Sequence, residues 1–167
     1  MPRREKGAPP QITPKSLDDY LEQMTKSAFQ SGISWDVIIA KWPGFQQAFK
    51  AFKIKHVANL GPDDVDELMQ DTRVVRNRPK IEATIHNAQT ILDLDKEYGG
   101  FRKYLRSFKD FDALVKDMRK RFKFLGDSGC YHFLYVVKEK VPDWHVWMKP
   151  KMEANMAKRK TRTRTAR

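Results

Sequence analysis

Apolar residues recur every three or four positions along most of this chain, which is the spacing of one face of an α-helix. The pattern predicts helices that begin near residue 17, cover 35–42 and 62–71, run from 79 to about 96, and continue in shorter pieces to residue 137. The apolar run 131–137 is the one stretch that also fits a strand. We therefore predict an all-α fold.

Proline and glycine mark where several of these helices should begin or end. Pro43-Gly44 is expected to end the second helix and Tyr98-Gly99-Gly100 the long helix, since proline interrupts helical hydrogen bonding and glycine favours a left-handed cap. Pro150 is expected to start a basic helix that reaches about Lys160 and frays beyond it. The prolines and glycines thus give the helical pattern definite boundaries.

The segment 60–88 predicts two helices joined by a tight basic turn. Gly61 can cap the first helix, and Pro79 suits the first turn of the second, where its missing N–H is not needed. A basic turn beside an outward-facing helix N-terminus is suited to holding phosphate. The plain alternative is an ordinary helical hairpin with a solvated turn.

Three stretches of the chain, in the same order, resemble the DNA-3-methyladenine glycosylase I family. They are Ser31-Gly32-Ile33-Ser34-Trp35, the hairpin residues Arg76-Asn77-Arg78 with Lys80-Ile81 and Asn87-Ala88, and Arg121-Phe122-Lys123-Phe124-Leu125-Gly126 followed by Cys130-Tyr131. Together they span roughly residues 17–147. Three ordered motifs are more specific than any one of them alone.

The resemblance implies a compact helix-hairpin-helix DNA glycosylase-like domain over residues 16–148. Its implied activity is that of a monofunctional DNA glycosylase of base excision repair, which flips an alkylated base such as 3-methyladenine out of duplex DNA and hydrolyses its N-glycosidic bond with water. The implied partner is duplex DNA with a damaged base. No lysine is expected to form a Schiff base.

The chain departs from the family pattern at two places. Ser27 occupies the position of a pocket glutamate, so the catalytic residue is unknown. The family's structural zinc would need Cys and His ligands, but only His145 matches, Lys149 replaces a cysteine, and the N-terminal ligand segment is missing. We predict no metal and no cofactor. The alternative function is therefore a catalytically inactive DNA-binding protein on the same fold.

The site residues are assigned from the resemblance and from side-chain chemistry. Trp35 is expected to stack on the flipped base, and Tyr131 to line the same pocket, although core packing is the alternative for both. Asp36 and Asp127 are the nearest replacement acids in the sequence. The residues expected to bind DNA phosphates are Arg76, Asn77, Arg78, Lys80 and Lys123.

The net charge of +12 lies mainly in the two ends of the chain. Residues 1–15 carry +3 and residues 149–167 carry +7, which leaves +2 for residues 16–148. We predict a disordered basic arm over 1–15, which holds four prolines, and a flexible basic tail over 149–167. Such arms bind polyanions by counterion release. A protein-interaction module whose arms bind polyanions is a third possible function.

The remaining composition narrows the protein class. The single cysteine, Cys130, excludes an internal disulfide framework and suits a reducing compartment. The sequence shows no membrane-length apolar run, and its first residues lack the apolar core of a secretory signal. We expect a monomeric, cytoplasmic, nucleoid-associated protein with no membrane partner.

Overall fold

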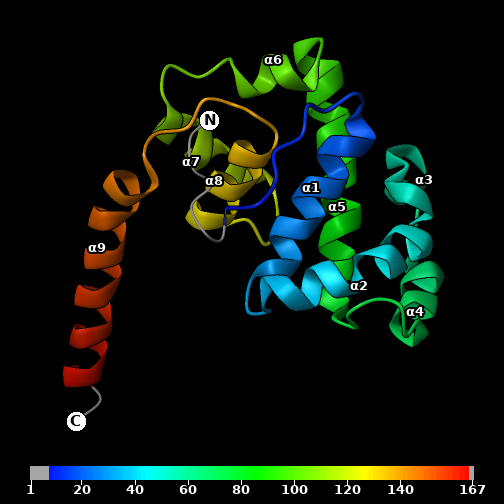
Figure 1. Cartoon of the computed structure of the whole chain (residues 1–167), viewed down its shortest axis with the longest axis horizontal. Helices are drawn as coiled ribbons and strands as arrows, with labels where there is room; N and C mark the ends of the chain where they lie inside the picture. Colours follow the sequence, from blue (N-terminus) through cyan, green and yellow to red (C-terminus); the bar gives the residue numbers. More distant parts are fainter. Residues whose placement is uncertain (1–7, 166–167) are drawn as a thin grey trace.

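The computed structural model describes residues 8–165, and this part of the chain contains helices and no strand (Figure 1). The prediction of an all-α fold is confirmed. The helices are α1 Leu17–Gln30, α2 Trp35–Ala48, the 3₁₀ helix η1 Lys50–Phe52, α3 Ile54–Ala58, α4 Pro62–Gln70, α5 Arg78–Tyr98, α6 Phe101–Leu105, α7 Phe111–Arg121, α8 Asp127–Val136 and α9 Trp144–Thr165.

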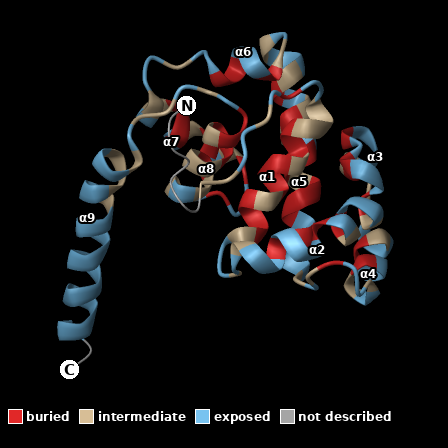
Figure 2. Ribbon diagram, in the orientation of Figure 1, coloured by how far each residue is buried: buried red, intermediate tan, exposed pale blue. Residues whose placement is uncertain are grey.

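The hydrophobic core lies around α1 and α5, which run side by side through the middle of the molecule (Figures 1 and 2). Helix α8 packs against α1, and α3 packs against α5. The buried faces of these helices repeat at the helical spacing expected from the sequence. On α1 they include Leu21, Met24 and Ala28, and on α5 Ile81, Ala88 and Ile91.

The helix ends at Gly61 and Gly99 fall where the sequence places them, and Asn77, predicted only as a phosphate ligand, also caps a helix. The N–H of Gly61 donates to Asp64 Oδ2 at 2.7 Å and caps α4. The side chain of Asn77 accepts the Lys80 N–H at 3.1 Å and caps α5. Gly99, at φ 69°, ends α5 in the left-handed conformation. Each cap uses contacts within a few residues, so local sequence determines it.

Pro43-Gly44 does not end the second helix, contrary to the prediction. Helix α2 continues through Pro43 to Ala48, because the ring stack that follows holds it in place. The Trp42 ring lies 5.0 Å from that of Phe45 and 5.2 Å from that of Phe52. Packing of these buried aromatic rings outweighs the backbone hydrogen bond that proline cannot donate.

Gly44 allows α2 to lie directly against the turn between α4 and α5. A Cβ added at Gly44 would lie 2.6 Å from the Arg73 carbonyl oxygen, a backbone atom with little freedom to move. We expect Gly44→Ala to lower the free energy of unfolding by about 1–3 kcal/mol in urea denaturation, since the clash outweighs alanine's helix preference. Gly126→Ala, where no atom lies within 4 Å, is the control. Equal stabilities of the two variants would contradict the close contact.

The N-terminal segment is held against α8 over part of its length. The Ile12 N–H donates to the Val136 carbonyl at 2.8 Å, and Gln11 Nε2 donates to the Tyr135 carbonyl at 2.9 Å. Residues 11 and 12 thus bind the C-terminal end of α8, where carbonyls lack helical partners. This differs from the predicted disordered arm over 1–15, of which residues 1–7 lie outside the described residues.

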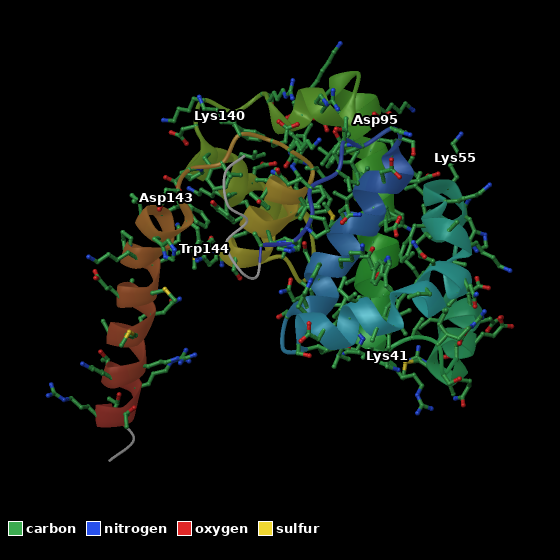
Figure 3. The ribbon with its side chains drawn as sticks, viewed as in Figure 1. Lys41, Lys55, Asp95, Lys140, Asp143 and Trp144 are labelled. Carbon is green, nitrogen blue, oxygen red and sulfur yellow. The ribbon has the colours of Figure 1, made fainter. Side chains whose placement is uncertain are left out.

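Helix α9 projects away from the helical body (Figure 1). It begins at Trp144, includes Pro150, and runs to Thr165 without a buried residue, so it is longer than the predicted helix from Pro150 to about Lys160. Figure 3 shows Asp143 and Trp144 at its root. The proposed boundary at residue 149 falls inside this helix, and residues 166–167 lie outside the described residues. No helix in the described part of the chain is long and apolar enough to cross a membrane.

Candidate functional site

Ser27, Trp35 and His132 meet where α1, α2 and α8 converge. The Ser27 Oγ lies 2.8 Å from His132 Nδ1, although 105 positions separate the two residues. The ring centroids of Trp35 and His132 are 5.2 Å apart at an interplanar angle of 69°. Ser27 is buried, whereas Trp35 and His132 are half-buried. Solvent therefore reaches part of both residues, and Trp35 is not fully buried in the core.

The imidazole in this cluster is neutral at physiological pH. Burial, and secondarily the positive charge of Lys26, lower the pKa of His132 to about 4. The Lys26 ammonium lies 5.1 Å from the centroid of the Trp42 ring, and burial lowers its own pKa as well. The position expected for a carboxylate thus holds a neutral hydroxyl–imidazole pair.

Lys80 is buried and does not fit its predicted role as a phosphate ligand. Its ammonium donates to the carbonyls of Phe29, at 3.1 Å, and Ser31, which belong to the C-terminal end of α1. The last turn of α1 has no basic residue of its own. Lys80 therefore supplies the positive charge that a helix C-terminus favours, and it ties α5 to the loop before Trp35.

The hairpin turn keeps some of its predicted phosphate ligands exposed. The Asn77 side chain is engaged as the cap of α5, which leaves its amide nitrogen for other contacts. Arg78 pairs with Asp66 and with Glu82 at 3.7 Å. Arg76 is exposed, and within residues 8–165 no carboxylate forms an ion pair with it. Arg76 is thus the hairpin cation that is most available to a phosphate.

Tyr131 does not contact Trp35, contrary to the prediction that the two share a pocket. Its hydroxyl donates to the Pro142 carbonyl at 2.6 Å, and its ring lies 4.8 Å from Trp144 and 5.5 Å from Trp147. Tyr131 belongs to an aromatic cluster that packs against the N-terminal end of α9. Side chains of consecutive residues on a helix point about 100° apart, so Tyr131 and His132 contact different neighbours.

The loop before α8 presents Lys123 and Phe124 at the surface. The Asn87 side chain, buried on α5, accepts the Lys123 N–H at 2.9 Å and donates to its carbonyl at 3.1 Å. Phe124 has a φ of 59° and is 42% exposed, and its ring centroid lies 5.9 Å from Lys80 Nζ. The Lys123 side chain is therefore free to bind a phosphate beside the hairpin.

Neither candidate acid from the sequence is held in the cluster. Asp127 pairs with Arg119 at 3.1 Å, and Asp36 is exposed in the first turn of α2. The residues also do not fit a zinc ion: His145 is exposed on α9, while Cys130 is buried and its pKa is raised by burial to about 12. Among the described residues, no three metal-ligating side chains converge.

Two residues of this region were missed by the sequence analysis. No role is assigned to His132 from the sequence, and Asn87 is included only as part of a motif. Each acts on a partner far along the chain, at 105 and 36 positions respectively. The period of apolar residues carries no signal for such polar contacts.

Comparisons with known sequences identify relatives of this chain. A family model described as methyladenine glycosylase matches residues 13–123. The DNA-3-methyladenine glycosylase of Haemophilus influenzae is 28% identical over 134 residues, which cover 68% of this chain and 72% of that protein. DNA-3-methyladenine glycosylase 1 of Escherichia coli is 31% identical over 126 residues, covering 63% and 67% respectively.

Solved structures resemble this fold over most of its length. The 3-methyladenine DNA glycosylase I of Staphylococcus aureus, described for its recognition of 3-methyladenine, matches with a TM-score of 0.66 and 27% identity, covering 78% of this chain and 79% of that one. A tyrosine-to-phenylalanine variant of 3-methyladenine DNA glycosylase I in complex with 3-methyladenine matches with a TM-score of 0.66 and 26% identity, covering 78% and 80%.

Proposed function

Because the chain belongs to the methyladenine glycosylase family, we propose that it is a monofunctional DNA glycosylase of base excision repair that releases alkylated bases such as 3-methyladenine. The observation that supports this function most directly is the half-buried Trp35 ring beside the Ser27–His132 pair, at the end of a loop that Lys80 links to the basic hairpin. The relatives named above carry the same activity in their names.

The chemistry needs little from a general acid when the base is already cationic. Alkylation of a ring nitrogen places a positive charge on the base, so the N-glycosidic bond breaks readily and water completes the hydrolysis. A cation over an indole face gains roughly 0.5–2 kcal/mol, which Trp35 can supply. The neutral Ser27–His132 pair places no positive charge of its own against such a base.

The DNA backbone would lie along the face formed by the α4–α5 turn and the α1–α2 loop. Both segments lie at the same end of the molecule in Figure 1, and Lys80 links them through the Ser31 carbonyl. Arg76, Arg78, the Asn77 amide and Lys123 would contact phosphates there. Helix α9, whose end of the chain carries +7 over 149–167, would add affinity that does not depend on sequence.

The function is tested by release of free 3-methyladenine from methylated duplex DNA under single-turnover conditions. We expect the purified protein to release the base and leave an abasic site with the strand uncut, since no lyase step is proposed. Binding to the methylated duplex without release of any base would refute the glycosylase and support the inactive DNA-binding alternative. An absence of both would favour a protein-interaction module.

Arg76→Ala should weaken binding to undamaged duplex DNA. Loss of one phosphate contact lowers the slope of log affinity against log salt by about 0.9. Filter binding or anisotropy at several salt concentrations measures that slope. Lys103→Ala, on the exposed surface of α6 at the other end of the molecule, is the matched control. If the two variants have equal slopes of log affinity against log salt, the hairpin does not contact the DNA.

Two further properties are part of the proposal. Action on chromosomal DNA implies a cytoplasmic, nucleoid-associated protein, and the single-domain architecture suits a monomer. Size-exclusion chromatography with light scattering tests the second property. A stable dimer in that experiment would contradict it.

A further inference from the structure

The Ser27 hydroxyl differs from the other buried hydroxyls on these helices. Thr25 Oγ1 donates to the Leu21 carbonyl at 2.7 Å and Thr84 Oγ1 to the Lys80 carbonyl at 2.9 Å, each within its own helix. Ser27, equally buried, is instead directed across to His132 on α8. Such a contact fixes the orientation of a side chain on the neighbouring helix.

The direction of this hydrogen bond follows from donor counting. A buried hydroxyl proton needs an acceptor, and within residues 8–165 the polar atom in hydrogen-bond contact with Ser27 Oγ is His132 Nδ1. A neutral imidazole that accepts at Nδ1 carries its proton at Nε2. Ser27 therefore selects the tautomer in which His132 has a donor at Nε2.

The Nε2–H of His132 has no hydrogen-bond partner in the part of the chain that the structure describes. The comparison with His86 is informative, because His86 Nε2 lies 3.0 Å from the Arg121 carbonyl and is engaged in the fold. His132 is also only half-buried, and its ring meets the Trp35 ring edge to face. A donor of fixed position thus lies beside a stacking surface.

We propose that His132 reads the flipped base: its Nε2–H donates a hydrogen bond to a ring-nitrogen acceptor of an alkylated purine, while Ser27 fixes the tautomer and Trp35 stacks on the base. This inference rests on the proposed function, because it assigns the polar contact within the same pocket. The neutral imidazole tolerates a cationic base, and its donor rejects a base edge that presents an N–H in that position. Ser27 is a positioning residue, and His132 a specificity-determining one.

Two substitutions of His132 separate the roles of its two ring nitrogens. His132→Asn places an amide near the position of Nδ1 and keeps the bond to Ser27, but it has no group at Nε2. His132→Gln extends an amide N–H to the position of Nε2. Thermal unfolding and affinity for undamaged duplex DNA, which should match the wild type in both variants, check that the fold and the DNA surface are intact.

The test uses free 3-methyladenine and its 1-deaza and 7-deaza analogues, each of which lacks one ring-nitrogen acceptor. Binding is measured by quenching of tryptophan fluorescence. We expect the wild type to bind one analogue about tenfold more weakly than 3-methyladenine, the size of one hydrogen bond. His132→Asn should bind all three bases equally, and His132→Gln should keep part of the discrimination.

The inference is overturned if His132→Asn discriminates among the three bases as the wild type does, or if the wild type binds both analogues as well as 3-methyladenine. The assay for base release from methylated DNA is run in parallel. If the protein releases the base from methylated DNA but does not discriminate among the three free bases, the proposed role of His132 is wrong and the glycosylase activity is supported. Discrimination without release supports base reading by His132 and refutes the hydrolase.

Discussion

Trp35→Ala should lower the single-turnover rate of 3-methyladenine release from methylated duplex DNA ten- to hundredfold, and this is the largest effect on activity that the structure predicts. Stacking of one base on an aromatic side chain contributes about 1–3 kcal/mol. Trp35 is half-buried with its ring against His132, so a flipped base would take up the surface that solvent now reaches. The alanine variant has no aromatic surface on which the base can stack.

Controls separate this effect from a general loss of structure or of DNA binding. Val37→Ala alters a side chain that is 43% exposed on the same helix, and it should leave the release rate unchanged. Trp35→Phe keeps an aromatic face of smaller area and should retain part of the activity. Affinity for undamaged duplex should be the same in all three variants. Release by Trp35→Ala at the wild-type rate would show that the base is held elsewhere.

Lys80→Met should lower the free energy of unfolding by about 2–3 kcal/mol. Lys80 was predicted as an exposed phosphate ligand, but it is buried in the structure. The methionine keeps most of the apolar stem but removes the ammonium that bonds the Phe29 and Ser31 carbonyls. Hydrogen bonds to a charged group contribute about 1.5–3 kcal/mol, and the carbonyls of a helix C-terminus would lose their positive partner. Urea denaturation with an unchanged m-value measures the loss.

The same substitution distinguishes a structural lysine from a phosphate ligand. Lys80→Met should leave the salt dependence of DNA affinity unchanged, because the ammonium is buried in the fold. Base release should fall, since Ser31 begins the loop that leads to Trp35 at the start of α2. Lys123→Met, at an exposed position, is the opposite case: it should reduce the salt slope and leave stability unchanged. The reverse result would return Lys80 to the DNA interface.

The arrangement of the site explains why some predicted residues remain candidates for their assigned roles and others do not. Arg76 lies in an exposed turn whose ends are set by local caps, so its type and position in the chain were sufficient to propose it. Lys80 lies only four positions further on, at the first turn of α5, yet its side chain faces α1. The side chain of Lys80 is buried because its face of α5 packs against α1. The spacing of residues within α5 does not show which face a neighbouring helix will cover.

The sequence by itself determined the helices, most of their ends and the hairpin. Apolar spacing, the Gly61–Asp64 and Asn77 caps and the left-handed Gly99 all depend on contacts within a few residues, and the ordered motifs indicated the family. These features are local, so they can be read along the chain without knowing what packs against them.

Only the tertiary structure decided which polar side chains meet. It paired Ser27 with His132, turned Lys80 toward α1, placed Tyr131 at the root of α9, and carried α2 through Pro43. The first two outcomes depend on packing between helices far apart in the sequence, and the other two depend on aromatic rings that pack together only when the chain folds. The energy of such packing outweighs local preferences, and its geometry is fixed only when the helices come together.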